Sequence, residues 1–489
     1  MRVKESPMGE KTIQCGNLIG GKWEQRGANG ITRLNPANIR EVVATAPDSS
    51  AEDVRRAIQA AADAFHPWRR TTPPERGKIV LRAAQLLESR LEEVAQLLTR
   101  EEGKIVSESR GEVKRAIDIM EYAAGMGRRL GGQTLPTEVP HVFCFTTRQP
   151  IGPVAAISPW NFPVAIPCWK IAPALVCGNT VVCKPSPLTP ATATRVVEIF
   201  EEAGLPPGVL NLVHGGAQAG SELINHPLIR GISFTGSTKV GMAIHMAAAQ
   251  RLAKVQLEMG GKNPQIILRD ADLDSAVKSL LTAAFGATGQ RCSATSRAIV
   301  ERKVAGEVAE RLVEGTKAIR VGPGDRPEVT MGPLVDESRL RDVKGFVDRA
   351  RAQGAAVVIG GCDPEGLRDG HYYAPTVVNV RPEHEIAREE VFGPVLSFIE
   401  VDDIEEALSV ANTVDYGLCA SIFTKDIGRA FTFIDKIDAG MIHVNRPGLG
   451  GFSHMPFGGF KYSSYGAREV GDDTINFYTD IKSVHIQET

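Results

Sequence analysis

The sequence has no apolar run of the roughly 20 residues that a membrane-spanning helix requires. It also lacks an excess of one charge, because 56 Lys and Arg residues face 58 Asp and Glu residues and no long block of one sign occurs. A nucleic-acid partner and an anionic membrane surface are therefore not expected. The first residues include basic side chains but no apolar stretch behind them, so no secretory segment is predicted. These absences favour a cytoplasmic protein that acts on a small molecule.

Cysteine is scarce, with eight residues scattered along the chain and no CxxC pair among them. No histidine stands at metal-ligand spacing from these cysteines, so neither a metal site nor a disulfide framework is predicted. In a reducing compartment most such thiols behave as small buried hydrophobic groups. A chemical role for any one of them must therefore be argued from its neighbours.

What the sequence does have is length: 489 residues, 43% of them hydrophobic, exceed what one hydrophobic core usually organises. Apolar residues three and four apart predict helices over 51–65, 73–103 and 112–130, and Pro74 is well placed near a helix start. Residues 131–152 combine β-branched and aromatic side chains between Gly and Pro boundaries, which predicts a hairpin that projects from the body. Such an arm often serves oligomerisation.

From residue 152 onward, short apolar runs alternate with helical segments, which predicts βαβ units and a parallel sheet. A second alternating series begins near residue 265 and predicts a second α/β domain. The tail, residues 477–487, has strand character and is suited to extend a sheet of a neighbouring subunit.

One strand–turn–helix pattern, GISFTGSTKVG, offers a nucleotide site, because amides framed by Gly236 and Gly241 at a helix N-terminus can face a pyrophosphate. Alone this signal is weak, since the spacing is not GxGxxG and plain packing explains two glycines equally well. Lys184 and Ser186 support it, because they stand just beyond a predicted strand end, where nucleotides bind in α/β sheets.

Five segments, taken together in order and spacing, resemble the aldehyde dehydrogenase superfamily over nearly the whole chain. They are ISPWNFPVAIPCWKIAPALVCGNTVVCKP, LEMGGKNPQIIL, FGATGQRCSATSRAIV, EEVFGPV and PFGGFKYSSYGAREVG. The resemblance implies an α/β fold with a Rossmann-like cofactor domain, an α/β catalytic domain and a small β oligomerisation arm, assembled as a homodimer or homotetramer. The implied boundaries are 1–131 and 153–259 for the cofactor domain, 260–444 for the catalytic domain, 132–152 and 471–489 for the arm, and 445–470 for a substrate-pocket loop.

The resemblance implies three catalytic residues: Cys292 as the nucleophile, Glu258 as the general base and Asn161 as the oxyanion donor. The chemistry requires these residue types. Attack of a thiolate on an aldehyde creates an alkoxide that amide donors stabilise, and the resulting thioester needs a base to activate water. Because a free thiol is largely protonated at neutral pH, the site is expected to promote the thiolate. Glu258 as a surface acid and Asn161 as a turn residue are the alternatives, but their joint occurrence with Cys292 at family spacing disfavours both.

The resemblance also implies use of NAD or NADP. It assigns Glu390 to the nicotinamide ribose and Phe392 to the neighbourhood of the ring. The remaining implied cofactor residues are Ser158, Trp160, Lys184, Ser186, Gly216, Gly236 and Ser237. Many NAD-preferring relatives carry a Glu three residues after the Lys, where this chain has Pro187. Without that carboxylate a 2′-phosphate is not repelled, so NADP acceptance is expected, although Pro187 is equally explained as a loop proline.

The resemblance assigns roles to two further groups of residues. Lys170 and Glu469 match a proposed proton exit from the base, with a surface ion pair as the alternative. The substrate pocket is expected to include Trp169, Arg291, Ser293 and Phe457.

The motifs are most similar to those of 2-oxoglutarate-semialdehyde (2,5-dioxopentanoate) dehydrogenases, and succinate semialdehyde is disfavoured because Trp169 replaces an Arg. A distal carboxylate would then bind Arg446 or His454, unless both are solvated loop residues. Two other functions stay open: a semialdehyde dehydrogenase that passes its thioester to CoA, which Glu258 disfavours, and a non-catalytic scaffold on the same fold.

Overall fold

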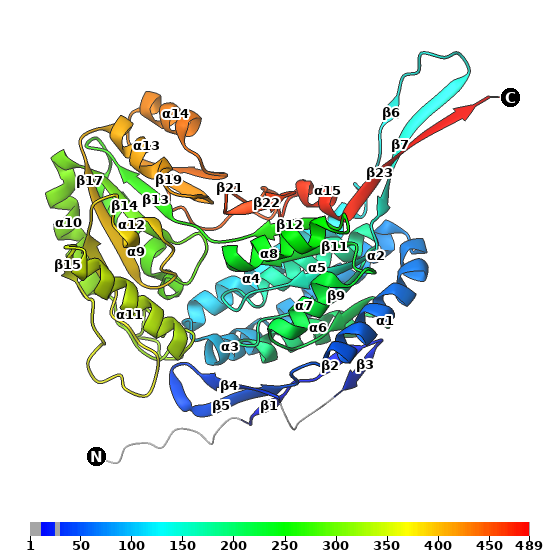
Figure 1. The fold of residues 1–489 in the computed structure, drawn as a ribbon, viewed down its shortest axis with the longest axis horizontal. Coiled ribbons are helices and arrows are strands. Elements are labelled where there is room, and N and C mark those ends of the chain that lie inside the picture. Colours follow the sequence, from blue (N-terminus) through cyan, green and yellow to red (C-terminus); the bar gives the residue numbers. More distant parts are fainter. Residues whose placement is uncertain (1–10, 25–29, 489) are drawn as a thin grey trace.

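Two α/β lobes, a projecting β arm and a small N-terminal sheet make up the chain (Figure 1). The structure is a computed structural model that describes residues 11–24 and 30–488. The first ten residues, for which the sequence predicts no targeting segment, lie outside the described part. No helix in the described ranges is both long and apolar enough to cross a membrane.

The larger lobe is built on an eight-stranded sheet with the order β22-β12-β11-β8-β9-β10-β2-β3. Its five central strands run parallel, and β22, β2 and β3 are antiparallel to their neighbours. The strands are β2 (Asn17–Ile19), β3 (Lys22–Glu24), β8 (Pro153–Ile157), β9 (Thr180–Lys184), β10 (Leu210–Leu212), β11 (Gly231–Thr235), β12 (Lys254–Glu258) and β22 (Ser464–Gly466).

Helices cover both faces of this sheet because successive side chains of a strand point to opposite sides. Val154 and Ala156 of β8 pack in one hydrophobic cluster, and Ala155 and Ile157 pack in another. The helices of this lobe are α1 (Ala51–Arg70), α2 (Pro73–Ser89), α3 (Leu91–Glu102), α4 (Val106–Met126), α5 (Ala165–Cys177), α6 (Pro190–Glu202), α7 (Ala217–Asn225), α8 (Thr238–Ala249) and α15 (Ile475–Tyr478), with the 3₁₀ turn η2 (Asp472–Thr474).

In the helical region 51–130, α1 extends past the expected end at residue 65, α4 begins before the expected start at residue 112, and one expected helix is divided. The expected helix over 73–103 is two helices, α2 and α3, which meet at Arg90 with φ −111° and ψ 14°. Periodicity could not reveal this break, because the apolar spacing continues across it. The predicted proline start is confirmed, since α2 begins with Pro73 and Pro74.

The smaller lobe is built on a seven-stranded sheet with the order β15-β16-β17-β14-β13-β19-β20, parallel except for β15. Its strands are β13 (Asn263–Ile267), β14 (Thr295–Glu301), β15 (Ala356–Ile359), β16 (Thr376–Asn379), β17 (Val395–Val401), β19 (Cys419–Phe423) and β20 (Met441–Val444). Its helices are α9 (Leu273–Phe285), η1 (Gly286–Gly289), α10 (Arg302–Lys317), α11 (Glu337–Ala352), α12 (Glu385–Arg388), α13 (Ile404–Asn412) and α14 (Ile427–Lys436). A short ladder of β18 (Tyr416–Gly417) and β21 (Phe460–Lys461) lies between the lobes.

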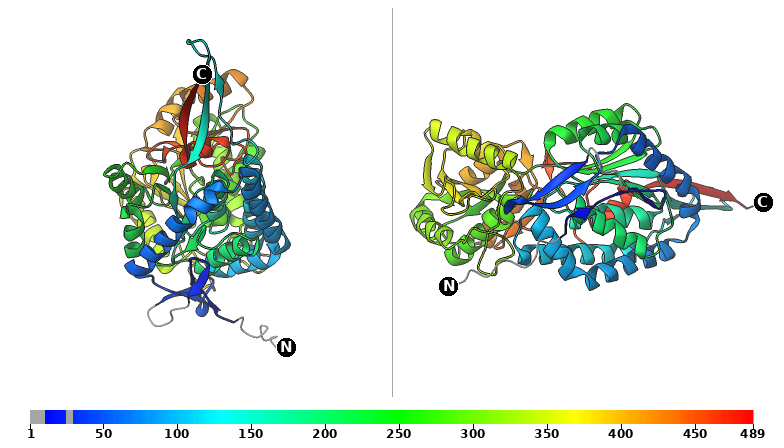
Figure 2. Two further views of the ribbon diagram at one scale, coloured as in Figure 1. Left: turned by 90° about the vertical axis from the view of Figure 1, so that its right-hand side faces the viewer. Right: turned by 90° about the horizontal axis from the view of Figure 1, so that it is seen from below.

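The predicted hairpin is present as β6 (Thr134–Leu135) and β7 (Val142–Pro150), and it projects from the body (Figure 2). The tail forms β23 (Thr479–Gln487), which pairs antiparallel with β7 of its own chain from Thr479 opposite Pro150 to Gln487 opposite Val142. At the opposite end of the large lobe lies a sheet of β1 (Ile13–Gln14), β4 (Ile31–Asn35) and β5 (Asn38–Ala46).

Candidate active site

Cys292 lies in the short segment between η1 and β14, and η1, which leads into it, has an unusual backbone. Ala287 and Thr288 both adopt left-handed conformations, with φ 48° and 57°. Each such residue costs on the order of 1–3 kcal/mol and persists only where its surroundings hold it. Here the Ala287 amide donates to Glu108 of α4 at 2.6 Å, and the Thr288 hydroxyl donates to the Gly332 carbonyl at 3.0 Å. The loop before the thiol is therefore fixed from both sides.

Asn263 of β13 fixes the other side of the thiol. Its amide nitrogen donates to the Cys292 carbonyl at 2.8 Å and to the Ala294 carbonyl at 2.9 Å, while its side-chain oxygen accepts from the Cys419 amide at 3.1 Å. The side chain thus uses both donors and its acceptor to join the thiol segment to the sheet.

Asn161 follows β8 and is buried against the same loop. Its side-chain nitrogen donates to the Gln290 carbonyl, two residues before Cys292, at 2.9 Å, and its own carbonyl accepts from Lys104 at 2.6 Å. The sequence-predicted oxyanion donor and nucleophile therefore approach each other, although they are 131 positions apart.

Lys104 is held in turn by Glu112 of α4, with Nζ 2.6 Å from Oε2. The other carboxylate oxygen of Glu112 accepts from the amides of Val164 and Ala165 at 2.8 and 3.2 Å, at the start of α5. A carboxylate suits this place because the first amides of a helix have no partner within it. The chain of contacts fixes the segment that carries Asn161.

Glu258 ends β12 and is buried, so the alternative of a solvated surface acid is wrong. The Ser464 hydroxyl donates to Oε2 at 2.5 Å. Burial, together with the nearby charge of Glu469, raises the pKa of Glu258 well above its ordinary value, and the bond from Ser464 opposes that rise. A carboxylate with a raised pKa is a better proton acceptor near neutral pH.

Lys170 and Glu469 form an ion pair, but not at the surface, since both residues are about 1% exposed. The Ser233 hydroxyl lies 3.1 Å from Lys170 Nζ and 3.3 Å from Glu469 Oε1. The second oxygen, Oε2, has no hydrogen-bond partner among the described atoms. The pair therefore leaves one acceptor atom open close to the general-base candidate.

Burial, together with the charges of Glu390 and Glu258, raises the pKa of the Cys292 thiol to about 12. The expectation that the site promotes the thiolate is thus not met by the protein alone. The charges of three carboxyl groups, those of Glu390, Glu258 and Glu469, act on the thiol, and the adjacent Arg291 pairs with Glu108 at 3.2 Å. The thiol needs an additional positive charge or a proton acceptor to ionise.

Two of the predicted cofactor residues, Trp160 and Phe392, meet edge to face with ring centroids 5.5 Å apart. Close by, Glu390 accepts from the Gly261 amide at 2.8 Å, and burial raises its pKa to about 7. The hydroxyl of Ser158, directly after β8, is buried without a hydrogen-bond partner among the described atoms. These groups line the carboxyl ends of parallel strands, where α/β sheets bind nucleotides.

Lys184 ends β9, and its Nζ donates to the carbonyls of Pro185 and Gly215 at 3.0 and 2.9 Å. Burial lowers its pKa to about 8. The two carbonyls leave the third ammonium donor open, and no acidic side chain forms an ion pair with Lys184 in the described ranges. Ser186 accepts from the Leu188 amide at 3.2 Å. An anionic group placed here would stabilise the lysine charge.

The predicted role of the glycine amides in the turn after β11 needs a correction. The amide of Gly236 is not free, because it donates to the Glu258 carbonyl at 3.0 Å, and that of Gly216 donates to Asp48 at 3.2 Å. A Cβ at position 236 would lie 2.5 Å from the ring of Phe234, so packing requires this glycine. Ser237 is the N-cap of α8, but its side chain makes no capping bond. Amides of the first turn of α8 remain as donors.

A small apolar cluster adjoins the thiol and contains two predicted substrate-pocket residues, Trp169 and Phe457, with ring centroids 5.3 Å apart. Ile119, Ile166, Leu418 and Val470 complete its buried part, and Cys292 packs against it.

The other predicted pocket residues are bound to the scaffold. The Ser293 carbonyl accepts from the Cys419 thiol at 3.5 Å, and the Arg291 guanidinium lies 5.9 Å from the Phe162 ring centroid besides pairing with Glu108. Arg446 and His454 are exposed, and both pack on the ring of Phe452.

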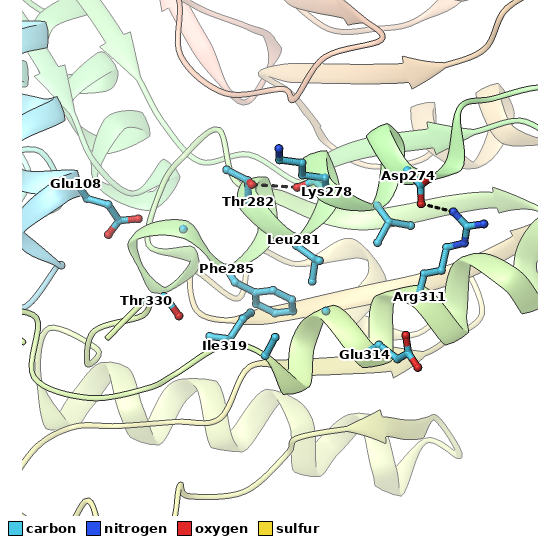
Figure 3. A pocket seen from close by; sticks show the side chains of 14 residues that line it. Glu108, Asp274, Lys278, Leu281, Thr282, Phe285, Arg311, Glu314, Ile319 and Thr330 are labelled. Atoms are coloured by element: carbon cyan, nitrogen blue, oxygen red, sulfur yellow. Dashed lines mark hydrogen bonds and ion pairs between the residues drawn. The ribbon is translucent and has the colours of Figure 1, made fainter. Parts of the chain in front are cut away.

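A separate open cavity of about 600 Å³ lies between α9 and α10 (Figure 3). Glu108 stands at one end, and the Asp274–Arg311 ion pair stands at the other. None of the sequence-predicted site residues lines it. Its size therefore does not identify it as the site of the chemistry.

Sequence reasoning missed the residues that position the three central groups: Lys104, Glu108, Glu112, Asn263 and Ser464. One signal was present, since Glu108 and Glu112 fall at helical spacing on the same face of α4 as apolar Ile119. The roles of Asn263 and Ser464 depend on contacts that only the folded chain creates.

The carboxyl ends of the parallel strands carry groups suited to a nucleotide, and a thiol, an amide and a carboxylate lie beside them. This geometry defines a nucleotide-dependent oxidoreductase. Comparison with known proteins agrees. The sequence profile described as the aldehyde dehydrogenase family matches residues 23–484. The chain therefore belongs to the aldehyde dehydrogenase family.

Among relatives, the alpha-ketoglutaric semialdehyde dehydrogenase of Bacillus subtilis is 45% identical over 476 residues, covering 96% of this chain and 98% of the relative. The 2,5-dioxopentanoate dehydrogenase of Saccharolobus solfataricus is 39% identical, with coverage of 96% and 98%. The malonate-semialdehyde dehydrogenase 1 of Geobacillus thermodenitrificans is 40% identical, with coverage of 95% and 96%.

Two solved structures are similar over the full length. Betaine aldehyde dehydrogenase of Staphylococcus aureus in complex with NAD+ has a TM-score of 0.95 and 34% identity, covering 97% of this chain and 95% of that one. An NADP dependent enzyme of E. coli has a TM-score of 0.94 and 35% identity, covering 97% and 98%. These similarities confirm the predicted fold.

Proposed function

We propose that the protein oxidises 2-oxoglutarate semialdehyde to 2-oxoglutarate with NAD(P)+ through a thioester on Cys292. The observation that carries the chemistry is the convergence of Asn161, Glu258 and an apolar cluster around that one thiol. The substrate is supported by the relatives named for this aldehyde, which are 39% and 45% identical over nearly the whole chain.

In the first step, the Cys292 thiolate attacks the aldehyde carbon, and the carbonyl oxygen becomes an alkoxide. Asn161 has one amide N–H bonded to Gln290, which leaves the second N–H to donate to that oxygen. The Cys292 backbone amide supplies another donor. One such donor is typically worth about 3 kcal/mol of transition-state stabilisation.

The residues at the strand ends fit a dinucleotide. The partnerless Ser158 hydroxyl, the open donor of Lys184 and the ring pair of Trp160 and Phe392 supply the polar and stacking groups that it requires. NAD(P)+ supplies, when bound, the acceptor for the hydride that leaves the alkoxide carbon. Glu390 has one carboxylate oxygen bonded to the Gly261 amide, which leaves the other to accept from a ribose hydroxyl when a dinucleotide is bound.

In the second step, Glu258 takes a proton from a water molecule that attacks the thioester, and the Cys292 thiolate leaves as the acid forms. The raised pKa of Glu258 suits this task. Glu469, paired with Lys170, then receives the proton, because it is electrostatically linked to Glu258 and has the open oxygen Oε2.

NADP is proposed to serve as well as, or better than, NAD. Pro187 offers no carboxylate to repel a 2′-phosphate, and Lys184 and Ser186 lie beside it. Pro187→Glu is expected to raise the KM for NADP+ more than that for NAD+. An equal effect on both coenzymes contradicts this assignment.

The arm supports a homodimer or homotetramer. Its exposed apolar side chains include Leu135, Phe143, Ile481 and Ile486, of which Phe143 and Ile486 stand opposite each other, and exposed apolar groups that gather on one element mark an interaction surface. Sedimentation equilibrium tests this proposal, and a monomer at micromolar concentration contradicts it. The enzyme is proposed to act in the cytoplasm, where a catalytic thiol stays reduced.

Steady-state kinetics test the function directly. Both coenzymes are measured with 2-oxoglutarate, malonate and succinate semialdehydes, betaine aldehyde and pentanal. The proposal requires the highest kcat/KM for 2-oxoglutarate semialdehyde. Equal efficiency across the panel contradicts it, and a requirement for CoA instead identifies the acyl-transferring alternative.

A further inference from the structure

Helix α4 turns one face toward the active site. Positions 108, 112, 115 and 119 are spaced by four, three and four residues, so they share that face. Glu108 reaches the loop before Cys292, Glu112 caps α5, and Ile119 belongs to the apolar cluster beside the thiol. Arg115 occupies the remaining place on this face, between the polar contacts and the apolar cluster.

Arg115 differs from its neighbours because it is half-buried yet makes no hydrogen bond or ion pair with any described residue. Burial lowers the pKa of its guanidinium, and the exposed Asp118, on the same helix, offsets this only in part. A guanidinium carries five N–H donors, and leaving them without partners is costly. Apart from Asp118, no described group therefore offsets the positive charge of Arg115.

The loop 445–459 lies opposite Arg115. A Cβ on Gly451 of that loop would lie 3.9 Å from Nη2 of Arg115, with no other atom within 4 Å. The space beside Gly451, between α4 and the loop that also carries Phe457, is therefore open except for this guanidinium. Position 451 leaves room there for another group.

The other cations near this region are already engaged or exposed. Arg291 pairs with Glu108, and Lys104 pairs with Glu112. Arg446 is exposed, with its guanidinium 5.6 Å from the centroid of Phe452. Arg115 is thus the half-buried cation of this face that has no ion pair with an acidic side chain among the described residues.

We propose that Arg115 binds the carboxylate at the far end of the aldehyde substrate. This proposal rests on the proposed function, and it replaces Arg446 and His454 as carboxylate ligands. Arginine matches a carboxylate with two parallel N–H donors, and a bound carboxylate supplies the missing counter-charge.

The chain length of the substrate agrees with this position. Arg115 lies four residues, about 6 Å along the helix axis, from Ile119 of the apolar cluster. With C–C bonds of about 1.5 Å, the four bonds of a five-carbon chain extend about 5 Å. The apolar cluster then contacts the carbon chain, and the guanidinium contacts the terminal carboxylate.

The test compares Arg115→Met with the natural enzyme on two five-carbon aldehydes, 2-oxoglutarate semialdehyde and pentanal. The expected result is a KM for the carboxylated aldehyde about 10- to 100-fold higher, because a charged hydrogen-bonded partner is lost. The kcat and the KM for pentanal should stay within about twofold. Unchanged activity on pentanal also shows that the variant is folded.

Two variants sharpen the test. Arg115→Lys keeps a single point charge and should recover part of the lost affinity. Lys114→Met removes a cation from the adjacent, exposed position and should change neither KM. An Arg115→Met variant that retains the KM for the carboxylated aldehyde, or that weakens both aldehydes alike, overturns the assignment.

Failure of this proposal is distinguishable from failure of the proposed function. If the natural enzyme prefers 2-oxoglutarate semialdehyde and Arg115→Met keeps that preference, the function stands and the arginine assignment falls. If a three-carbon semialdehyde is preferred and Arg115→Met loses it, the function falls and the carboxylate site stands. No preference for any carboxylated aldehyde contradicts both.

Discussion

The side-chain nitrogen of Asn161 donates to the carbonyl of Gln290 at 2.9 Å, and this bond settles the orientation of the amide. Only the NH₂ end can donate to a carbonyl, so the amide nitrogen of Asn161 lies toward the loop that carries Cys292, and its second N–H is left to donate elsewhere. The oxyanion donor is thereby positioned by the loop that carries the nucleophile, and both groups depend on one backbone.

Asn161→Asp tests this arrangement. The substitution replaces an N–H donor with a carboxylate oxygen, which repels both the Gln290 carbonyl and the developing alkoxide. We expect kcat to fall by about 10²- to 10³-fold or more. Steady-state rates measure this loss, and Asn225→Asp on the surface helix α7 serves as the control. A loss of less than tenfold means that Asn161 does not stabilise the alkoxide.

Ser464→Ala should move the pH dependence of thioester hydrolysis to higher pH. The Ser464 hydroxyl bonds to the charged form of Glu258 and lowers its pKa, so its removal raises that pKa further. Because the base acts only when deprotonated, the rising limb of the rate against pH shifts upward. Single-turnover hydrolysis rates between pH 5 and pH 9 test the shift. A downward shift contradicts the role of Glu258.

Glu469→Gln should shift the rising limb of the rate against pH to lower pH. The negative charge of Glu469 raises the pKa of Glu258, so a neutral amide at position 469 lets Glu258 ionise at lower pH. The same pH series detects the shift. If Glu469 also accepts the proton, the rate on the plateau falls as well. A variant with an unshifted limb excludes electrostatic linkage between the two groups.

Glu390→Gln should make the Cys292 thiol more reactive in the protein without coenzyme. The charge of Glu390 raises the pKa of this thiol, so its removal lowers the pKa and increases the thiolate fraction at a given pH. Alkylation by iodoacetamide at pH 8, followed by mass spectrometry of the Cys292 peptide, measures the change. Glu389→Gln alters an exposed neighbour and should have little effect. Equal alkylation rates in all three proteins contradict the electrostatic account.

Much of the fold was predictable from local pattern. Short apolar runs such as that of β8 indicate buried strands, helices such as α6 show the helical period, and the hairpin and tail appear where β-branched residues gather. The break at Arg90 was not predictable, because the apolar period continues through it. Pairing of β23 with β7 of the same chain depends on contacts more than 300 positions apart, which no local period encodes.

Within the candidate site, only the residues that stand in the sequence motifs could be predicted. Cys292, Glu258 and Asn161 stand in distinctive segments, and the structure brings Asn161 and Glu258 to the surroundings of the thiol. The burial of Lys170 and Glu469 could not be read from the sequence, because a charged pair is usually at the surface. Arg115 was missed because one charged residue on a mixed helix face resembles a solvated one until the opposite loop is placed.

The most direct test of the account is the fate of Cys292 in the variant Glu258→Gln. The variant is mixed with 2-oxoglutarate semialdehyde and NADP+, quenched in acid and analysed by mass spectrometry of the intact protein. The account predicts one equivalent of NADPH in a burst, followed by a stalled protein that carries the acyl group on Cys292. Full steady-state turnover without an acylated protein would contradict the central claim.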